Sequence, residues 1–60
     1  MDWLKQIRLE KCLSQKQVAD AVNITQSSYS AVERGSKHPS VPLAKRIAKL
    51  LGFDWTKFYP

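Results

Sequence analysis

The feature that most restricts the fold of this 60-residue chain is the stretch from Ser14 to Gly35, which contains two helix start signals eleven positions apart. Ser14 and Thr25 can each cap a helix with a hydroxyl oxygen, and each is followed directly by a glutamine. Gln17 stands three residues after Ser14, which is the spacing of a capping box. Asn23, between the two signals, tolerates the left-handed backbone that ends a helix. The stretch therefore predicts two short helices joined by a tight turn.

Helix signals of the same kind run through the rest of the chain. No segment alternates apolar and polar residues as a half-buried strand would, so we expect an all-α fold. A first helix is expected to begin with Asp2 as its cap and to place Arg8 on its inner face. A fourth helix follows the cap Ser40, and a short fifth helix follows the cap Asp54. These signals predict one compact five-helix domain over residues 1–60.

The charge of the chain narrows its partners. Ten Lys and Arg residues against five Asp and Glu residues give a net charge of +5, which favours a polyanion, nucleic acid before membrane. A charge that serves only solubility is the alternative. The single cysteine, Cys12, cannot close an intramolecular disulfide, and neither a metal site nor a cofactor motif is evident, so we expect a cytoplasmic protein without cofactors. No acid–base or nucleophile arrangement is present, and an enzyme is not expected.

The central stretch also resembles a known family. L-S-Q-K-Q-V-A-D-A-V-N-I-T-Q-S-S-Y-S-A-V-E-R-G-S-K-H-P-S, residues 13–40, resembles the phage-repressor and Cro-type helix-turn-helix domain, the Xre-like family of bacterial and phage regulators. The flanking sequence at Leu4–Arg8 and at Ile47–Gly52 is similar to the family as well. The resemblance implies a lambda-repressor-like domain with a helix-turn-helix at about 15–34. Its recognition helix, at about 26–34, would lie in the major groove of DNA.

The resemblance also implies roles in DNA binding. Gln26 matches the family residue that reads base edges, and a side-chain amide suits adenine because it donates and accepts hydrogen bonds at once. Gln15 matches a residue that braces this reader and touches a phosphate. Further base-reading candidates are Ser27, Ala31 and Ser30. The candidates for the DNA backbone are Ser14, Gln15, Thr25, Arg34, Ser36 and Lys37. Ordinary solvated side chains are the alternative for the two glutamines and the serines of the third helix, and a solvated basic loop is the alternative for Arg34, Ser36 and Lys37.

Two further family positions concern the structure of the domain. Arg8 and Glu33 match a pair that forms an internal salt bridge between the first and third helices. Cys12 stands where the family has a glycine that ends the first helix. Either the backbone at Cys12 is strained or the turn there differs.

The expected function combines these roles. We expect a sequence-specific regulator of double-stranded DNA, acting as a repressor by occupying a palindromic operator in the cytoplasmic nucleoid. A symmetric homodimer would place two recognition helices about 34 Å apart, one turn of the duplex. Its interface is expected to use the C-terminal aromatics Trp55, Phe58 and Tyr59. Neither a membrane nor a small-molecule effector is expected as a partner. The alternative is an antitoxin or a protein-binding adaptor with the same fold.

Overall fold

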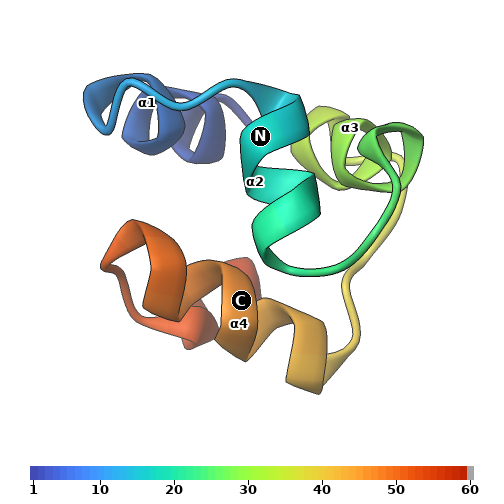
Figure 1. Cartoon of the computed structure of the whole chain (residues 1–60). Coiled ribbons are helices and arrows are strands. Elements are labelled where there is room, and N and C mark those ends of the chain that lie inside the picture. The colour runs from blue at the N-terminus through green and yellow to red at the C-terminus, as the bar shows by residue number, and fades with distance from the viewer. Residues whose placement is uncertain (60) are drawn as a thin grey trace.

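The structure is a computed structural model that describes residues 1–59, and Figure 1 shows its helices arranged around a single core. The elements are α1 (Asp2–Glu10), α2 (Gln15–Ala21), α3 (Gln26–Arg34), α4 (Val41–Leu51) and the 3-10 turn η1 (Trp55–Phe58). Residues 1–59 contain no strand, so the all-α prediction is confirmed. The element expected to be a fifth α-helix is a four-residue 3-10 turn, and the five-helix arrangement is therefore not confirmed.

Side-chain caps fix where the helices begin. The Ser14 hydroxyl accepts a hydrogen bond from the backbone amide of Gln17 at 3.0 Å. The side-chain oxygen of Gln17 accepts from the backbone amide of Ser14 at 2.8 Å, which completes the predicted capping box. Thr25 caps α3 with its hydroxyl alone, which accepts from the Ser28 backbone amide at 3.1 Å. The prediction that Asp2 caps α1 is wrong, because Met1 is the cap residue and makes no side-chain bond. Asp2 is instead the first helical residue, where a negative charge suits the helix dipole.

The turns after α1 and α2 both use left-handed backbone at residues other than glycine. Cys12 has φ 58° and Asn23 has φ 63°. Asn23 suits this conformation because its short polar side chain tolerates it, whereas Cys12 has no such advantage. The backbone at Cys12 is therefore strained, one of the two outcomes that the missing glycine predicted.

One hydrophobic core joins the elements. α2 lies between α1 and α3 in Figure 1, and α4 closes the other side of the molecule. Ala19 on α2 is fully buried, and a small side chain there lets neighbouring helices pack closely. The core cluster consists of Leu4, Val18, Ala19, Val22, Tyr29, Val32, Leu43, Ala44, Ile47, Leu51 and Phe58.

An aromatic cluster ties the end of the chain to its beginning. The ring of Trp3 on α1 lies 5.3 Å from that of Phe53 and 5.2 Å from that of Phe58, both in edge-on arrangements. Phe58 is consequently only 6% exposed. The assignment of Phe58 to a dimer interface is thus corrected, since its ring packs in the core of the monomer.

Candidate nucleic-acid interface

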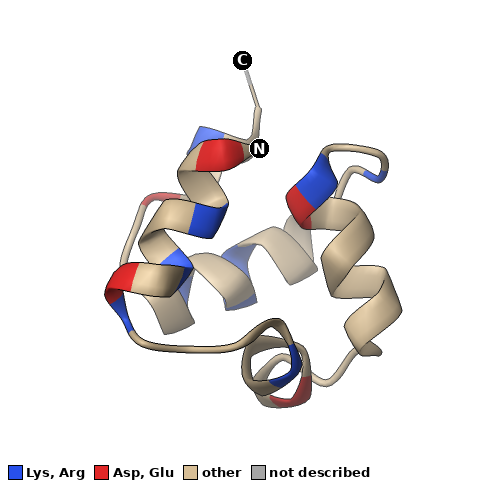
Figure 2. Cartoon of the chain, turned by 90° about the horizontal axis from the view of Figure 1, so that it is seen from above, with Lys and Arg blue, Asp and Glu red and all other residues tan. Residues whose placement is uncertain are grey.

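The outward side of α3 is short, polar and almost free of charge. Tyr29 and Val32 anchor the inner side of the helix in the core. In Figure 2 the α3 ribbon carries no charged residue until its last turn, where Glu33 and Arg34 lie. The base-reading candidates lie on the accessible surface, with Gln26 and Ser27 exposed and Ser30 and Ala31 half-buried. A helix with such small side chains can approach a flat or grooved partner closely.

Gln15 makes a different contact from the one that the family resemblance implied. Its Nε2 donates to Oε1 of Glu33 at 3.3 Å, and no hydrogen bond joins it to Gln26 within residues 1–59. In this structure Gln15 therefore contacts Glu33, and its bracing of Gln26 stays a prediction. A buried carboxylate oxygen is a stronger acceptor than a neutral amide, which explains why the Gln15 side chain turns towards α3 at Glu33.

A buried ion pair joins α1 to α3. Arg8 Nε and Nη2 donate to the two carboxylate oxygens of Glu33 at 2.9 and 3.0 Å. Arg8 Nη1 donates to the Leu13 carbonyl at 2.8 Å. Arg8 is 7% exposed and Glu33 is 6% exposed. These are the two residues that the family resemblance assigned to an internal salt bridge. The pair fixes the end of α3 relative to α1 through a forked geometry.

The pair also sets the ionisation of its members. Burial favours the protonated form of Glu33, but the hydrogen bonds from Arg8 and Gln15 and the charge of Arg8 outweigh burial, so the pKa of Glu33 lies below its ordinary value. The hydrogen bonds to Glu33 raise the pKa of Arg8 in return. Burial likewise raises the pKa of the nearby Tyr29 hydroxyl, which has no hydrogen-bond partner of good geometry within residues 1–59. Glu33 and Arg8 are therefore charged at neutral pH.

The residues after α3 combine helix capping with exposed positive charge. The Ser36 hydroxyl donates to the Ala31 carbonyl at 3.1 Å, so this hydroxyl closes the helix end rather than pointing freely outward. Arg34 Nη1 donates to the Ser30 hydroxyl at 2.7 Å, along the outer side of α3. Lys37 is exposed. Arg34 and Lys37 thus leave two accessible cations beside the end of α3.

The two hydroxyls at the helix starts have a structural role first. Ser14 and Thr25 are exposed, and their oxygens accept hydrogen bonds from amides of the following turns. The remaining free amides of each first turn point out of the helix start, a place suited to a phosphate.

Half-buried aromatics lie on another part of the surface. Trp55 and Tyr59 line a groove of about 390 Å³ together with Val41 and Thr56. The Tyr59 hydroxyl donates to the Pro39 carbonyl at 2.8 Å, and the Trp55 and Tyr59 rings are 5.8 Å apart. Of the three aromatics predicted for a dimer interface, Trp55 and Tyr59 are the accessible ones.

The structure also draws attention to Lys5, which the sequence did not single out. Lys5 lines a cavity with Arg8, Gln15 and Glu33. Its position three residues before Arg8 places both side chains on one side of α1. This spacing is the sequence feature from which the place of Lys5 beside Arg8 could have been predicted. Among residues 1–59, no cluster of His, Cys, Asp and Glu could hold a metal ion, and no helix is long and apolar enough to cross a membrane.

Comparison with known proteins agrees with this geometry. Residues 4–58 match the family described as helix-turn-helix. An uncharacterised HTH-type transcriptional regulator of Bacillus subtilis, YqaF, is 47% identical over 95% of this chain and 75% of its own length. The cryptic phage CTXphi transcriptional repressor RstR of Vibrio cholerae is 29% identical over 82% of this chain and 44% of its own. An uncharacterised HTH-type regulator of Methanothermobacter thermautotrophicus is 39% identical over 82% and 71%. No solved structure matches the chain.

Proposed function

The chain belongs to the helix-turn-helix family and carries the DNA-binding domain of a transcriptional regulator, and from this premise we propose that it is a repressor that binds a palindromic operator as a homodimer. It would act by occupying DNA in the cytoplasmic nucleoid. The single core supports treating residues 1–60 as one helix-turn-helix domain. The observation that carries the proposal is the bare outward side of α3, which begins with an exposed glutamine.

Base reading is assigned to the start and outer side of α3. Gln26 is exposed, and none of the hydrogen bonds within residues 1–59 involves its side chain, so the amide is free to donate and accept at adenine. Ser27 is its exposed neighbour, while Ser30 and Ala31 would contribute close contacts. With so few long side chains on this surface, sequence-dependent DNA shape would supply part of the preference.

Backbone contacts are assigned to both ends of the motif. The starts of α2 and α3, at Ser14 and Thr25, offer free amides and the positive end of the helix dipole. Gln15, Arg34 and Lys37 add an amide and two cations, and the Ser36 hydroxyl would reach a phosphate only by leaving Ala31. If a dimer makes six to ten phosphate contacts, affinity falls about 10³-fold or more between 50 and 200 mM salt.

Dimerisation is assigned to the groove of Trp55 and Tyr59. Half-buried aromatics in a groove with apolar lining are typical of interface cores, and Val41 beside them is 43% exposed. The test is analytical ultracentrifugation of Val41→Glu against Leu9→Glu, a control with the same charge change at a 48% exposed leucine of α1. We expect only Val41→Glu to shift the protein to monomer. An equal distribution for both variants would reject this interface.

DNA reading is tested by fluorescence anisotropy on a palindromic duplex library at two salt concentrations. Gln26→Ala is compared with Gln6→Ala, which removes an exposed glutamine from α1. Gln26→Ala should cost about 1–3 kcal/mol on the preferred site and relax the base choice there, whereas Gln6→Ala should change neither. Unchanged preference in Gln26→Ala would remove this residue from the reading surface. Absence of duplex binding by the wild type would instead favour the antitoxin or adaptor alternative.

Arg34 should behave differently from Gln26 in the same assay. Arg34→Ala is expected to weaken binding to all sequences alike and to reduce the slope of affinity against salt by about one unit. An unaltered slope would return Arg34 to the role of a solvated surface residue.

A further inference from the structure

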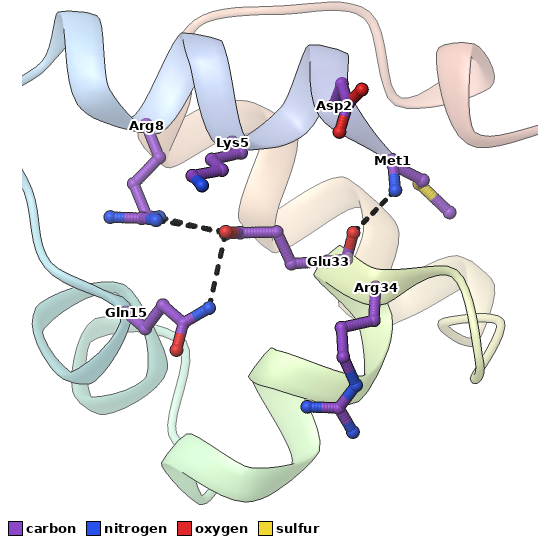
Figure 3. A pocket seen from close by; sticks show the side chains of 7 residues that line it. All are labelled: Met1, Asp2, Lys5, Arg8, Gln15, Glu33 and Arg34. Atoms are coloured by element: carbon purple, nitrogen blue, oxygen red, sulfur yellow. Dashed lines mark hydrogen bonds and ion pairs between the residues drawn. The ribbon is translucent and has the colours of Figure 1, made fainter.

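A polar cavity of about 550 Å³ lies where α1, the start of α2 and the end of α3 meet. Figure 3 shows its lining side chains around the Arg8–Glu33 pair, with Lys5 reaching in from α1 and Gln15 from α2. The full lining is Met1, Asp2, Lys5, Arg8, Gln15, Glu33 and Arg34. Its volume lies within the range of pockets that bind small ligands.

The acceptors in the centre of this cavity are already used. Both carboxylate oxygens of Glu33 receive hydrogen bonds, from Arg8 and from Gln15. The Glu33 main-chain carbonyl also accepts from the amino nitrogen of Met1 at 2.6 Å. The central carboxylate therefore has little capacity left to satisfy another cation.

Donors, in contrast, remain in excess. An ammonium has three N–H donors, and the side-chain ammonium of Lys5 forms neither a hydrogen bond nor a salt bridge with any residue in the range 1–59. Gln15 uses one of its two amide hydrogens on Glu33. Arg34, at the rim, is bonded only to the neutral Ser30 hydroxyl. Asp2 is the opposing charge and lines the Met1 end of the cavity, so the surplus of donors lies on the Lys5 side.

We propose that this α1–α3 cavity binds a phosphate group, with Lys5 and the free amide hydrogen of Gln15 as its donors and Arg34 closing the rim. Phosphate suits the site because it offers several negatively charged acceptor oxygens to these donors, and Lys and Arg are the usual cations that hold it. The group can belong to the DNA backbone, in which case the inference rests on the proposed function and adds Lys5 to the contact surface. It can equally belong to a free phosphate-bearing ligand.

Two assays separate these sources. In the first, the amide resonances of the protein are followed by NMR during titration with inorganic phosphate, at an ionic strength held constant with chloride. In the second, the slope of duplex affinity against salt is measured. Both assays compare the wild type with Lys5→Gln and with Lys49→Gln, which removes the same charge from an exposed position of α4 outside the cavity.

A backbone phosphate predicts that Lys5→Gln lowers the salt slope by about one unit more than Lys49→Gln does. A free phosphate predicts saturable shifts at Lys5, Gln15 and Arg34, with affinity at least about fivefold weaker in Lys5→Gln and unchanged in Lys49→Gln, equivalent to about 1 kcal/mol. Identical behaviour of the two variants in both assays overturns the proposal. The phosphate titration contains no DNA, so it decides the free-ligand arm even if the wild type shows no sequence preference and the proposed function fails.

Discussion

The buried ion pair between Arg8 and Glu33 gives the sharpest test of how this fold is held together. Replacing Arg8 with methionine removes three donors, two of them to Glu33 and one to the Leu13 carbonyl. The Glu33 carboxylate, 6% exposed, would then keep its burial with only the Gln15 amide as a partner. Stranding one member of such a pair costs about 3–5 kcal/mol.

This cost is large for so small a domain. A chain of this length has a free energy of unfolding of about 3–9 kcal/mol, at about 0.05–0.15 kcal/mol per residue. Arg8→Met should therefore remove most of the stability and lower Tm by about 12–40 °C, using about 4–8 °C per kcal/mol for a domain of this size. The fluorescence of Trp3 and Trp55 together with far-UV circular dichroism in urea would report the loss.

The double variant Arg8→Met, Glu33→Met separates the cost of one unpaired buried charge from the net contribution of the ion pair to stability. Replacing both charges with apolar side chains of similar length should be nearly neutral or stabilising, because no buried charge is then left unpaired. The coupling energy from the double-mutant cycle should thus exceed about 2 kcal/mol in favour of the pair. A loss below about 1 kcal/mol in Arg8→Met, or a double variant as unstable as the sum of the singles, would refute the reasoning.

Four further results are expected. The pKa of Glu33 is lowered below its ordinary 4.5, so its contribution to stability is present above that pH and is lost as the pH falls through the folded-state pKa. Glu33→Gln should therefore make Tm depend less on pH in the acid range, and an unchanged dependence would contradict this. Tyr29→Phe removes a buried hydroxyl without a good partner and should change the free energy of unfolding by less than about 1 kcal/mol; a larger loss in urea would indicate a bond. Ser14→Ala should cost about 0.5–2 kcal/mol through the capping box, and no change in Tm would show the box to be unimportant. Cys12→Gly should be neutral or stabilising by up to about 1 kcal/mol, because relief of strain at φ 58° offsets the added freedom of the unfolded chain; clear destabilisation would argue against strain.

The boundaries of α3 and α4 could be predicted from the sequence because local chemistry decides them. Thr25 and Ser40 accept hydrogen bonds from amides only a few residues away, and Gly35 and Gly52 end the helices in left-handed backbone. The cap of α1 was predicted one residue too late, because Asp2 has a side chain that suits a cap but lies inside the first turn of the helix. At η1, the choice between an α-helix and a 3-10 turn depends on how the last aromatics pack.

The candidate site divides in the same way. The helical period places Ser27 and Arg34 opposite the buried Tyr29 and Val32. Gln26 lies three residues before Tyr29, so its exposure comes from its place at the start of α3 and not from the period. The partner of Gln15 could not be deduced from its neighbours in sequence, because Glu33 lies 18 residues away. The role of Phe58 likewise depends on Trp3 at the other end of the chain.

The sequence by itself determined the helices, their order and the polar side of α3, because capping, turn chemistry and apolar period act within about four residues. Tertiary structure alone decided that Gln15 serves the Arg8–Glu33 pair and that Phe58 enters the core. It also decided that Lys5 lines a cavity with the end of α3. Each of these outcomes depends on which distant side chain offers an acceptor, a ring or an open space. The packing of α1, α2, α3 and the C-terminal aromatics against one another fixes that choice.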